Sequence, residues 1–188
     1  MNDPTTSCPN YFVEYFGYPK ETPENVIKKY REKGICPFVH SLKILRNLEG
    51  DDKCIKVPHK LGKAIGACTI RYLNKDYIIC PRRFLQRLII FKDIILLVAN
   101  EIRTWKNVYA IKEVNLRNLG RVDYVLFDSY TNDFIGVEIN ALDTTGSLLK
   151  GSFGTHPWPS AKLMLIQIIA KGALFETYNK KYFWIIQN

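Results

Sequence analysis

Residues 121–141 constrain the fold of this chain more than any other stretch. Two runs rich in β-branched and aromatic residues, 121–128 and 134–141, flank a polar turn. This pattern is typical of two antiparallel strands joined by a short loop. Because the side chains of a strand alternate between its two faces, a shift of one residue would exchange the apolar and the polar face. The pattern therefore predicts the register as well as the pairing.

The register that keeps one face apolar pairs Asp128 with Asp133 across a four-residue loop, and it places Asp123 opposite Glu138 on the other face. Directly opposed residues have Cβ atoms about 4.5 to 5.5 Å apart, so two carboxylates there would repel each other. Mg²⁺ removes such repulsion and is commonly held by one or two carboxylates, water and a substrate phosphate. We therefore predict a catalytic Mg²⁺ site at Asp123 and Glu138. Two solvated acids on an exposed sheet face are the alternative.

Two further residues are predicted to support this site. Asn140 lies two positions after Glu138 and therefore on the same face of the strand. Its amide can orient a water molecule or a phosphate oxygen, but it carries no positive charge. Glu113, on the preceding strand, would add a third carboxylate, or it is a surface acid beside Lys112.

The rest of the chain predicts a mixed α/β protein with two parts. From residue 81 onward the periodicity indicates a helix, three strands, a helix and a strand, at 83–101, 108–116, 121–128, 134–141, 159–171 and 181–186. Gly172 is expected to end the second helix. Three consecutive strands flanked by helices form an α/β/α sandwich. Before residue 81 only 23–33 has helical spacing, so we expect a loop-rich subdomain at 1–80 and a core domain at 81–188.

Four cysteines precede the predicted core domain: Cys36, Cys54, Cys68 and Cys80. No two of them form a C-x-x-C pair, so their spacing identifies no standard zinc site. Their surroundings are rich in Pro, Gly and Lys and offer few apolar residues to bury a thiol. We therefore predict that the four thiolates hold a structural metal ion. Four buried thiols are the alternative.

The acids on neighbouring strands resemble the PD-(D/E)xK nuclease superfamily, in which an acid precedes an acid-x-lysine motif. Nearly the whole chain is similar to NotI-type restriction endonucleases, through FGYP near the start, CPF at 36–38, ICP at 79–81 and VEIN-ALDTTG at 137–146. The resemblance implies a homodimeric type II enzyme that cuts double-stranded DNA with Mg²⁺, and a structural iron or zinc ion on the four cysteines. Asn140 stands where the superfamily has lysine and NotI-type enzymes have glutamine.

Charge and hydropathy agree with a nucleic-acid partner in the cytoplasm. The chain has 27 Lys and Arg against 18 Asp and Glu, a net charge of +9, which favours an anionic partner. We find no secretory signal and no apolar run long enough to span a membrane. Two other functions stay open: a metal-stabilised DNA-binding protein with a degenerate site, and a repair nuclease for damaged or branched DNA. The chain is also compatible with a truncated family member.

Overall fold

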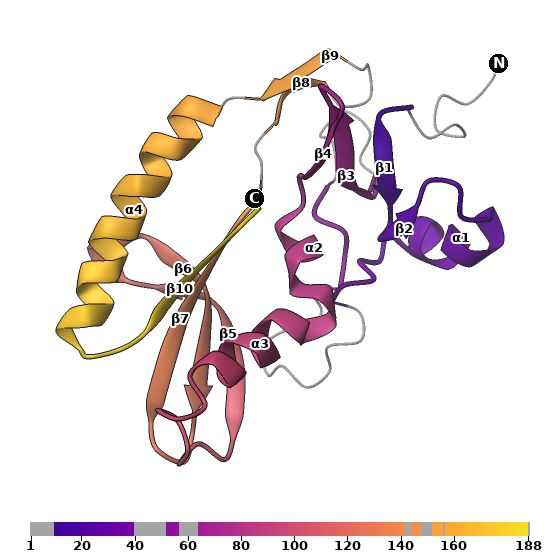
Figure 1. Ribbon diagram of the computed structural model, residues 1–188. Helices are drawn as coiled ribbons and strands as arrows, with labels where there is room; N and C mark the ends of the chain where they lie inside the picture. Colours follow the sequence, from indigo (N-terminus) through magenta and orange to yellow (C-terminus); the bar gives the residue numbers. More distant parts are fainter. Residues whose placement is uncertain are drawn as a thin grey trace.

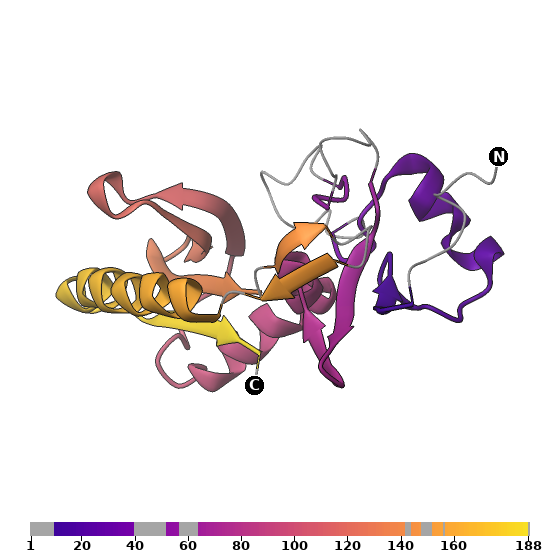
Figure 2. The same ribbon diagram turned by 90° about the horizontal axis from the view of Figure 1, so that it is seen from above.

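The structure is a computed structural model that describes residues 10–39, 52–56, 64–141, 144–147, 152–155 and 157–187. Two four-stranded sheets dominate it. Seen from above in Figure 2, the sheets lie at opposite ends of the molecule, with the short helix α2 (Pro81–Leu85) between them. The mixed α/β class predicted from the sequence is confirmed. No helix among the described residues has the length and hydropathy needed to cross a lipid bilayer.

The sheet nearer the C-terminus has the strand order β10-β7-β6-β5 (Figure 1). Its strands are β5 (Val108–Asn115), β6 (Arg121–Asp128), β7 (Asp133–Asn140) and β10 (Tyr182–Ile186). The first three are antiparallel neighbours, and β10 runs parallel to β7. All four lie within two residues of the runs that the sequence predicts.

Helices pack on both faces of this sheet. On one face, Phe91 and Ile94 of α3 (Ile89–Leu97) share a buried cluster with Leu126 of β6. On the other face, Phe175 of α4 (Pro157–Thr177) packs tightly against β7. A Cβ atom added at Gly136 would lie 2.4 Å from the Phe175 ring, so only glycine permits this approach. The predicted layering of helix, sheet and helix is present around these four strands.

The two helices predicted after residue 81 differ from the structure in extent. The predicted helix at 83–101 is interrupted at the 3₁₀ turn η1 (Gln86–Leu88), where three consecutive residues have φ of 43°, 57° and 74°. The interruption lets both Leu85 and Phe91 be buried in one cluster, which helical spacing alone does not reveal. Gly172 does not end α4, because packing on either side of it outweighs its cost of roughly 1 kcal/mol in a helix.

The N-terminal region contains a sheet and a buried core that its composition does not predict. Its sheet has the order β2-β1-β3-β4, with α1 (Glu24–Lys33) beside it. The strands are β1 (Phe12–Tyr15), β2 (Tyr18–Pro19), β3 (Ala67–Tyr72) and β4 (Lys75–Ile78). They bury a core that includes Phe12, Ile27, Ile70 and Ile79. Composition missed this core because its residues come from strands more than fifty residues apart.

Three smaller elements complete the described chain. They are η2 (Arg117–Leu119) before β6, and a two-stranded hairpin of β8 (Thr144–Ser147) and β9 (Ser152–Thr155). Gln187 links the two sheets: it accepts a hydrogen bond from the Ile78 backbone N–H at 2.7 Å and donates one to the Asp76 carbonyl at 2.8 Å. The C-terminal strand is thereby attached to the N-terminal sheet.

The loop end of the β6–β7 hairpin has the register that the sequence predicts. Asp128 pairs with Asp133, and Tyr124 pairs with Val137. The buried Asp128 carboxylate accepts four hydrogen bonds: from the backbone N–H groups of Lys106, Asn107 and Thr131, and from the Thr131 hydroxyl. Burial acts to raise the pKa of Asp128, but these donors hold it at about 2.

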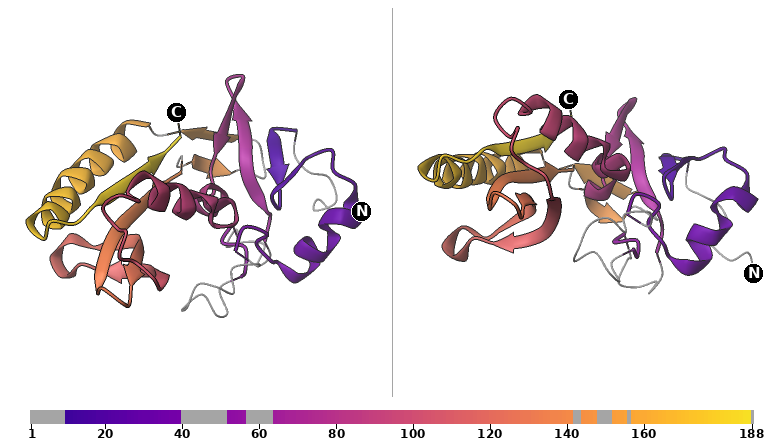
Figure 3. Two further views of the ribbon diagram at one scale, coloured as in Figure 1. Left: turned by 60° about the horizontal axis from the view of Figure 1, so that its bottom comes forward. Right: turned by 90° about the horizontal axis from the view of Figure 1, so that it is seen from below.

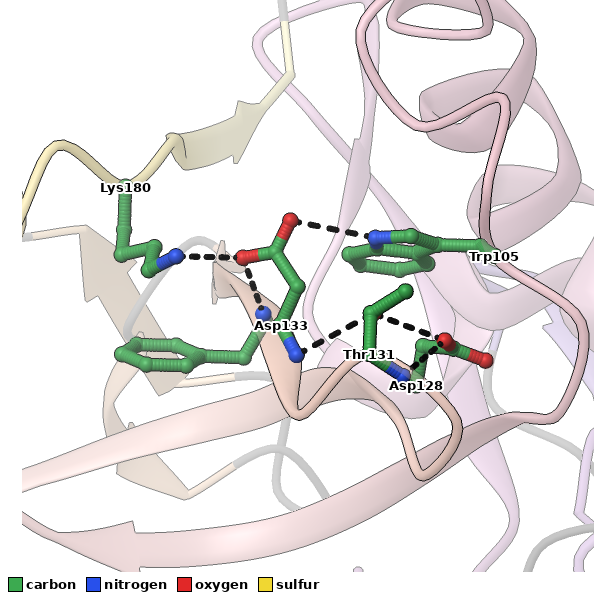
Figure 4. Close-up of polar contacts among 6 residues, drawn as sticks. Trp105, Asp128, Thr131, Asp133 and Lys180 are labelled. Carbon is green, nitrogen blue, oxygen red and sulfur yellow. Dashed lines mark hydrogen bonds and ion pairs between the residues drawn. The ribbon is translucent and has the colours of Figure 1, made fainter.

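Asp133 closes the same loop through side chains from two other segments (Figure 4). It accepts a hydrogen bond from the Trp105 indole N–H at 3.1 Å and an ion pair from Lys180 at 2.6 Å. Burial opposes these donors, which together hold its pKa below the ordinary value. Both acids at this end are therefore structural.

Candidate active site

At the open end of the hairpin the two strands separate before the predicted acid pair. The ladder between β6 and β7 ends at Tyr124 and Val137, so Asp123 has no backbone partner in β7. The predicted register also implies that Val122 faces Ile139 on the apolar face of the hairpin. In the structure these two residues lie in different core clusters. That part of the predicted register is wrong, because β6 does not continue its regular alternation through Asp123.

The Asp123 side chain takes the place of the missing backbone acceptor. Its Oδ2 accepts a hydrogen bond from the Ile139 backbone N–H at 2.8 Å. Burial raises the pKa of Asp123 to about 6; the Ile139 bond and the charge of Lys171 oppose the rise, and the charges of Glu138 and Glu113 add to it. The burial of Asp123 and the nearby acids therefore favour a proton or a bound cation on its carboxylate.

Glu138 is held by one residue of helix α4 and one of strand β10. Its carboxylate receives the Lys171 ammonium group at 2.8 Å and the Tyr182 hydroxyl at 3.2 Å. Glu138 and Lys171 are 8% and 2% exposed, so the reading of Glu138 as a solvated surface acid is wrong. Lys171 also donates to the Arg121 carbonyl at 2.6 Å, which fixes it next to the start of β6.

The charges of these residues act on one another across the end of the sheet. The charge of Glu138 raises the pKa of Asp123, and Lys171 lowers it. Burial raises the pKa of the Tyr182 hydroxyl far above its ordinary value, and Glu138 and then Asp123 add to that rise. The two predicted acids thus influence each other electrostatically, and Lys171 acts on both.

Lys171 is the residue of this candidate site that the sequence analysis did not predict. It was expected to be the last residue of a helix ending at Gly172. One signal was present: Lys171 lies four residues before Phe175 and seven after Met164, on the side of the helix that carries apolar residues. A lysine on an apolar face needs a buried carboxylate partner. Lys162 and Gln167, on the same helix, are exposed.

The other two predicted residues border the site. Glu113 has φ of 53° and interrupts the β5 ladder opposite Asp123. Its carboxylate is 3.4 Å from Arg121 and 3.6 Å from Lys112, and its side chain is 53% exposed. The Asn140 amide donates to the Met164 sulfur at 2.7 Å, so it is directed toward α4. The prediction that Asn140 positions water or phosphate gains no support from this contact.

A cavity of about 120 Å³ opens beside Asp123 on the side away from α4. It is lined by Ile55, Pro81, Arg82, Lys112, Glu113, Asp123, Tyr124 and Ile139. The space would hold about four water molecules, at roughly 30 Å³ each. Two cationic side chains, Arg82 and Lys112, line the cavity together with the acids Glu113 and Asp123, so the cavity suits a small anionic group or a hydrated cation.

The four predicted metal-binding cysteines are all buried with free thiols. Cys54 lies in the N-terminal core, and Cys36 and Cys68 lie in the cluster that contains α3. The argument that the N-terminal region lacks apolar residues to bury them is therefore wrong. Burial raises the pKa of Cys36 to about 11, and it also raises the pKa of Cys68 and Cys80.

The cysteines nevertheless influence one another. Repulsion between a Cys68 thiolate and thiolates at Cys80, Cys36 and Cys54 adds to the raised pKa of Cys68. Backbone hydrogen bonds to the sulfurs act in the opposite direction, from Phe38 to Cys36, from Gly17 to Cys68, and from Arg82 and Arg83 to Cys80. Within the described ranges, however, no three His, Cys, Asp or Glu side chains are arranged so that they could hold a metal ion.

No model of a known protein family matches the sequence, and a search of curated proteins finds no significant similarity.

Proposed function

We propose that the chain is a Mg²⁺-dependent endonuclease of double-stranded DNA with a PD-(D/E)xK core, and that it acts as a type II restriction enzyme. One observation carries the proposal: Asp123 and Glu138, on adjacent strands, share the field of the buried Lys171. An acid whose pKa is raised toward neutrality by burial and by a second acid is typical of catalytic sites.

The acids fit a Mg²⁺ ion in kind and number, because this ion is commonly held by one or two carboxylates together with substrate phosphate and water. Bound between Asp123 and Glu138, Mg²⁺ would polarise the scissile phosphate and acidify a water molecule. The raised pKa of Asp123 indicates that a cation could replace its proton. Glu113, which lines the same cavity as Asp123, could add a third carboxylate.

Lys171 would supply the positive charge that Asn140 lacks. A buried ammonium group beside Glu138 stabilises negative charge more strongly than one in water, because little solvent screens it. Arg82 and Lys112, which line the cavity at Asp123, would attract the phosphate. The net charge of +9 favours the same partner over longer distances.

Cleavage of a genomic DNA panel with and without Mg²⁺ tests the proposal. We expect Mg²⁺-dependent double-strand breaks that Asp123→Ala and Glu138→Ala each reduce by roughly a hundredfold or more. Asp93→Asn, a change at an exposed acid on α3, is the matched control and should cut normally. No cleavage by the wild-type chain, or full cleavage by Asp123→Ala, would refute the proposal.

The direction of Asn140 toward Met164 favours a second candidate, a DNA-binding protein with a degenerate nuclease site. Such a protein would bind DNA without Mg²⁺ and leave it intact. A preference for branched or damaged DNA over defined sequences would instead indicate a repair nuclease. The same DNA panel separates the three functions when it includes branched and damaged duplexes and a binding assay.

We further propose that Cys36, Cys54, Cys68 and Cys80 hold a structural iron or zinc ion, whose binding would draw their sulfurs closer together than they lie in the structure. Support comes from their shared burial, their mutual charge effects and the backbone donors to three of the sulfurs, since such donors stabilise thiolates. A bound cation would offset the cost of burying those thiolates. Elemental analysis should find about one metal ion per chain, and Cys68→Ser should abolish it. Metal-free folded protein would leave four buried thiols as the explanation.

A further inference from the structure

The outer side of α4 is apolar and uncovered. Leu165, Ile166 and Ile169 are 55%, 55% and 70% exposed, and their spacing places them on one side of the helix. The opposite side carries Lys171 and Phe175 and is buried against the sheet. In Figures 1 and 3, α4 lies at the edge of the molecule with no described element over its outer side. A helix that is apolar on both sides is normally covered on both.

Two opposite charges lie at the ends of this apolar stripe. Lys162 is seven residues before Ile169 and Glu176 is seven residues after it, and both are exposed. Seven residues are close to two helical turns, so all three share one line along the helix. If two copies of α4 pack antiparallel with Ile169 at the centre, Lys162 of each copy lies opposite Glu176 of the other. Parallel packing would place like charges together.

The sizes of the side chains show the same complementarity. In the antiparallel arrangement Leu165 lies opposite Ala173, and Ile166 lies opposite Gly172, because each pair is symmetric about position 169. A Cβ atom added at Gly172 would meet nothing within 4 Å, so the side of the helix at Gly172 is open to a neighbour. Large residues on the first half of the stripe thus match small residues on the second half.

We propose that a second copy of this chain binds here, through antiparallel pairing of the outer faces of two α4 helices about a two-fold axis at Ile169. Such a self-complementary patch is the kind that a symmetric dimer uses. The stripe is small beside the roughly 800 Å² per partner of a standard interface, so we expect a weak dimer. The proposal does not depend on nuclease activity, since Lys171, which contacts Glu138 of β7, lies on the opposite side of α4.

Charge reversal tests the pairing, with association measured by sedimentation velocity on the full chain. The wild-type chain should form a dimer at micromolar concentrations. Lys162→Glu and Glu176→Lys should each weaken dimerisation by about tenfold or more, because each variant opposes like charges twice. The two variants mixed together should associate as well as the wild type, since every contact is then between opposite charges. The double variant should also dimerise.

Matched variants separate this surface from others. Lys92→Glu, an equal charge change on the exposed side of α3, should leave the dimer intact. Ile169→Glu should abolish it, with circular dichroism confirming that the helix content is unchanged. A monomeric wild-type chain, or a dimer that neither charge reversal weakens, would overturn the proposal; a monomer that instead binds vesicles or DNA through Ile169 would do the same.

Discussion

The two ends of the β6–β7 hairpin carry two acids each, and one of the four, Asp123, is held differently from the two acids at the loop end. At the loop end, Asp128 and Asp133 receive several hydrogen bonds and an ion pair, and the pKa of both is lowered. At the open end, Asp123 has one backbone donor and its pKa is raised to about 6. The number of donors around the carboxylate, rather than its burial, thus separates Asp123 from Asp128 and Asp133.

The largest expected effect concerns the ion pair at the open end. Lys171→Met removes the cation from a carboxylate that is 8% exposed, and breaking a buried pair in this way costs about 3 kcal/mol or more. We expect urea unfolding to show that loss, and adding Glu138→Gln should restore most of it because no buried charge is then left unpaired. Equal losses in the single and double variants would show that the pair does not hold α4 to the sheet.

The second effect concerns the loop end. Asp128→Asn keeps the size of the side chain but replaces an acceptor of four hydrogen bonds with a neutral amide. We expect the melting temperature to fall by about 5 °C or more at neutral pH. Since the pKa of Asp128 is lowered from 3.8 to about 2, this contribution is present above pH 4 and is lost as the pH falls toward 2. Thermal melts across that range measure it.

The third expected effect is a gain of stability, and it tests the difference between Asp123 and Asp128 most directly. The pKa of Asp123 is raised from 3.8 to about 6, so the folded state binds more protons than the unfolded state between these values, and stability falls as the pH rises through them. Asp123→Asn should therefore stabilise the protein above pH 6, by roughly 2 kcal/mol. Below pH 4 the gain should disappear. A loss of stability at pH 7 would mean that the Asp123 carboxylate is structural, like Asp128.

The smallest effect is expected at Asp133, which is only partly buried. Asp133→Asn weakens the contacts to Trp105 and Lys180, but the amide oxygen can still accept one hydrogen bond. A half-exposed ion pair contributes little, so the melting temperature should change by only about 1 or 2 °C. DNA cleavage should be unaffected. A decrease in cleavage with unchanged stability would connect the loop end to the active site.

The local pattern determined the element types and the register next to the hairpin loop. Alternation from Tyr124 to Asp128 and from Asp133 to Val137 permits one pairing, and that pairing is present. Strands β5, β6, β7 and β10, helix α1 and the position of α4 are also readable from local periodicity, and so is the presence of Glu138 on a polar face. These features depend on residues close together in the sequence.

The tertiary structure alone decided the features that join distant segments. At Asp123 the ladder to β7 ends and the ladder to β5 is interrupted at Glu113. The partner of Glu138 comes from a helix thirty-three residues further along. The N-terminal core likewise unites strands that the sequence keeps far apart. Periodicity describes which face a side chain occupies, but it cannot say which distant residue covers that face. For this reason the sequence identified the acids of the site and missed Lys171.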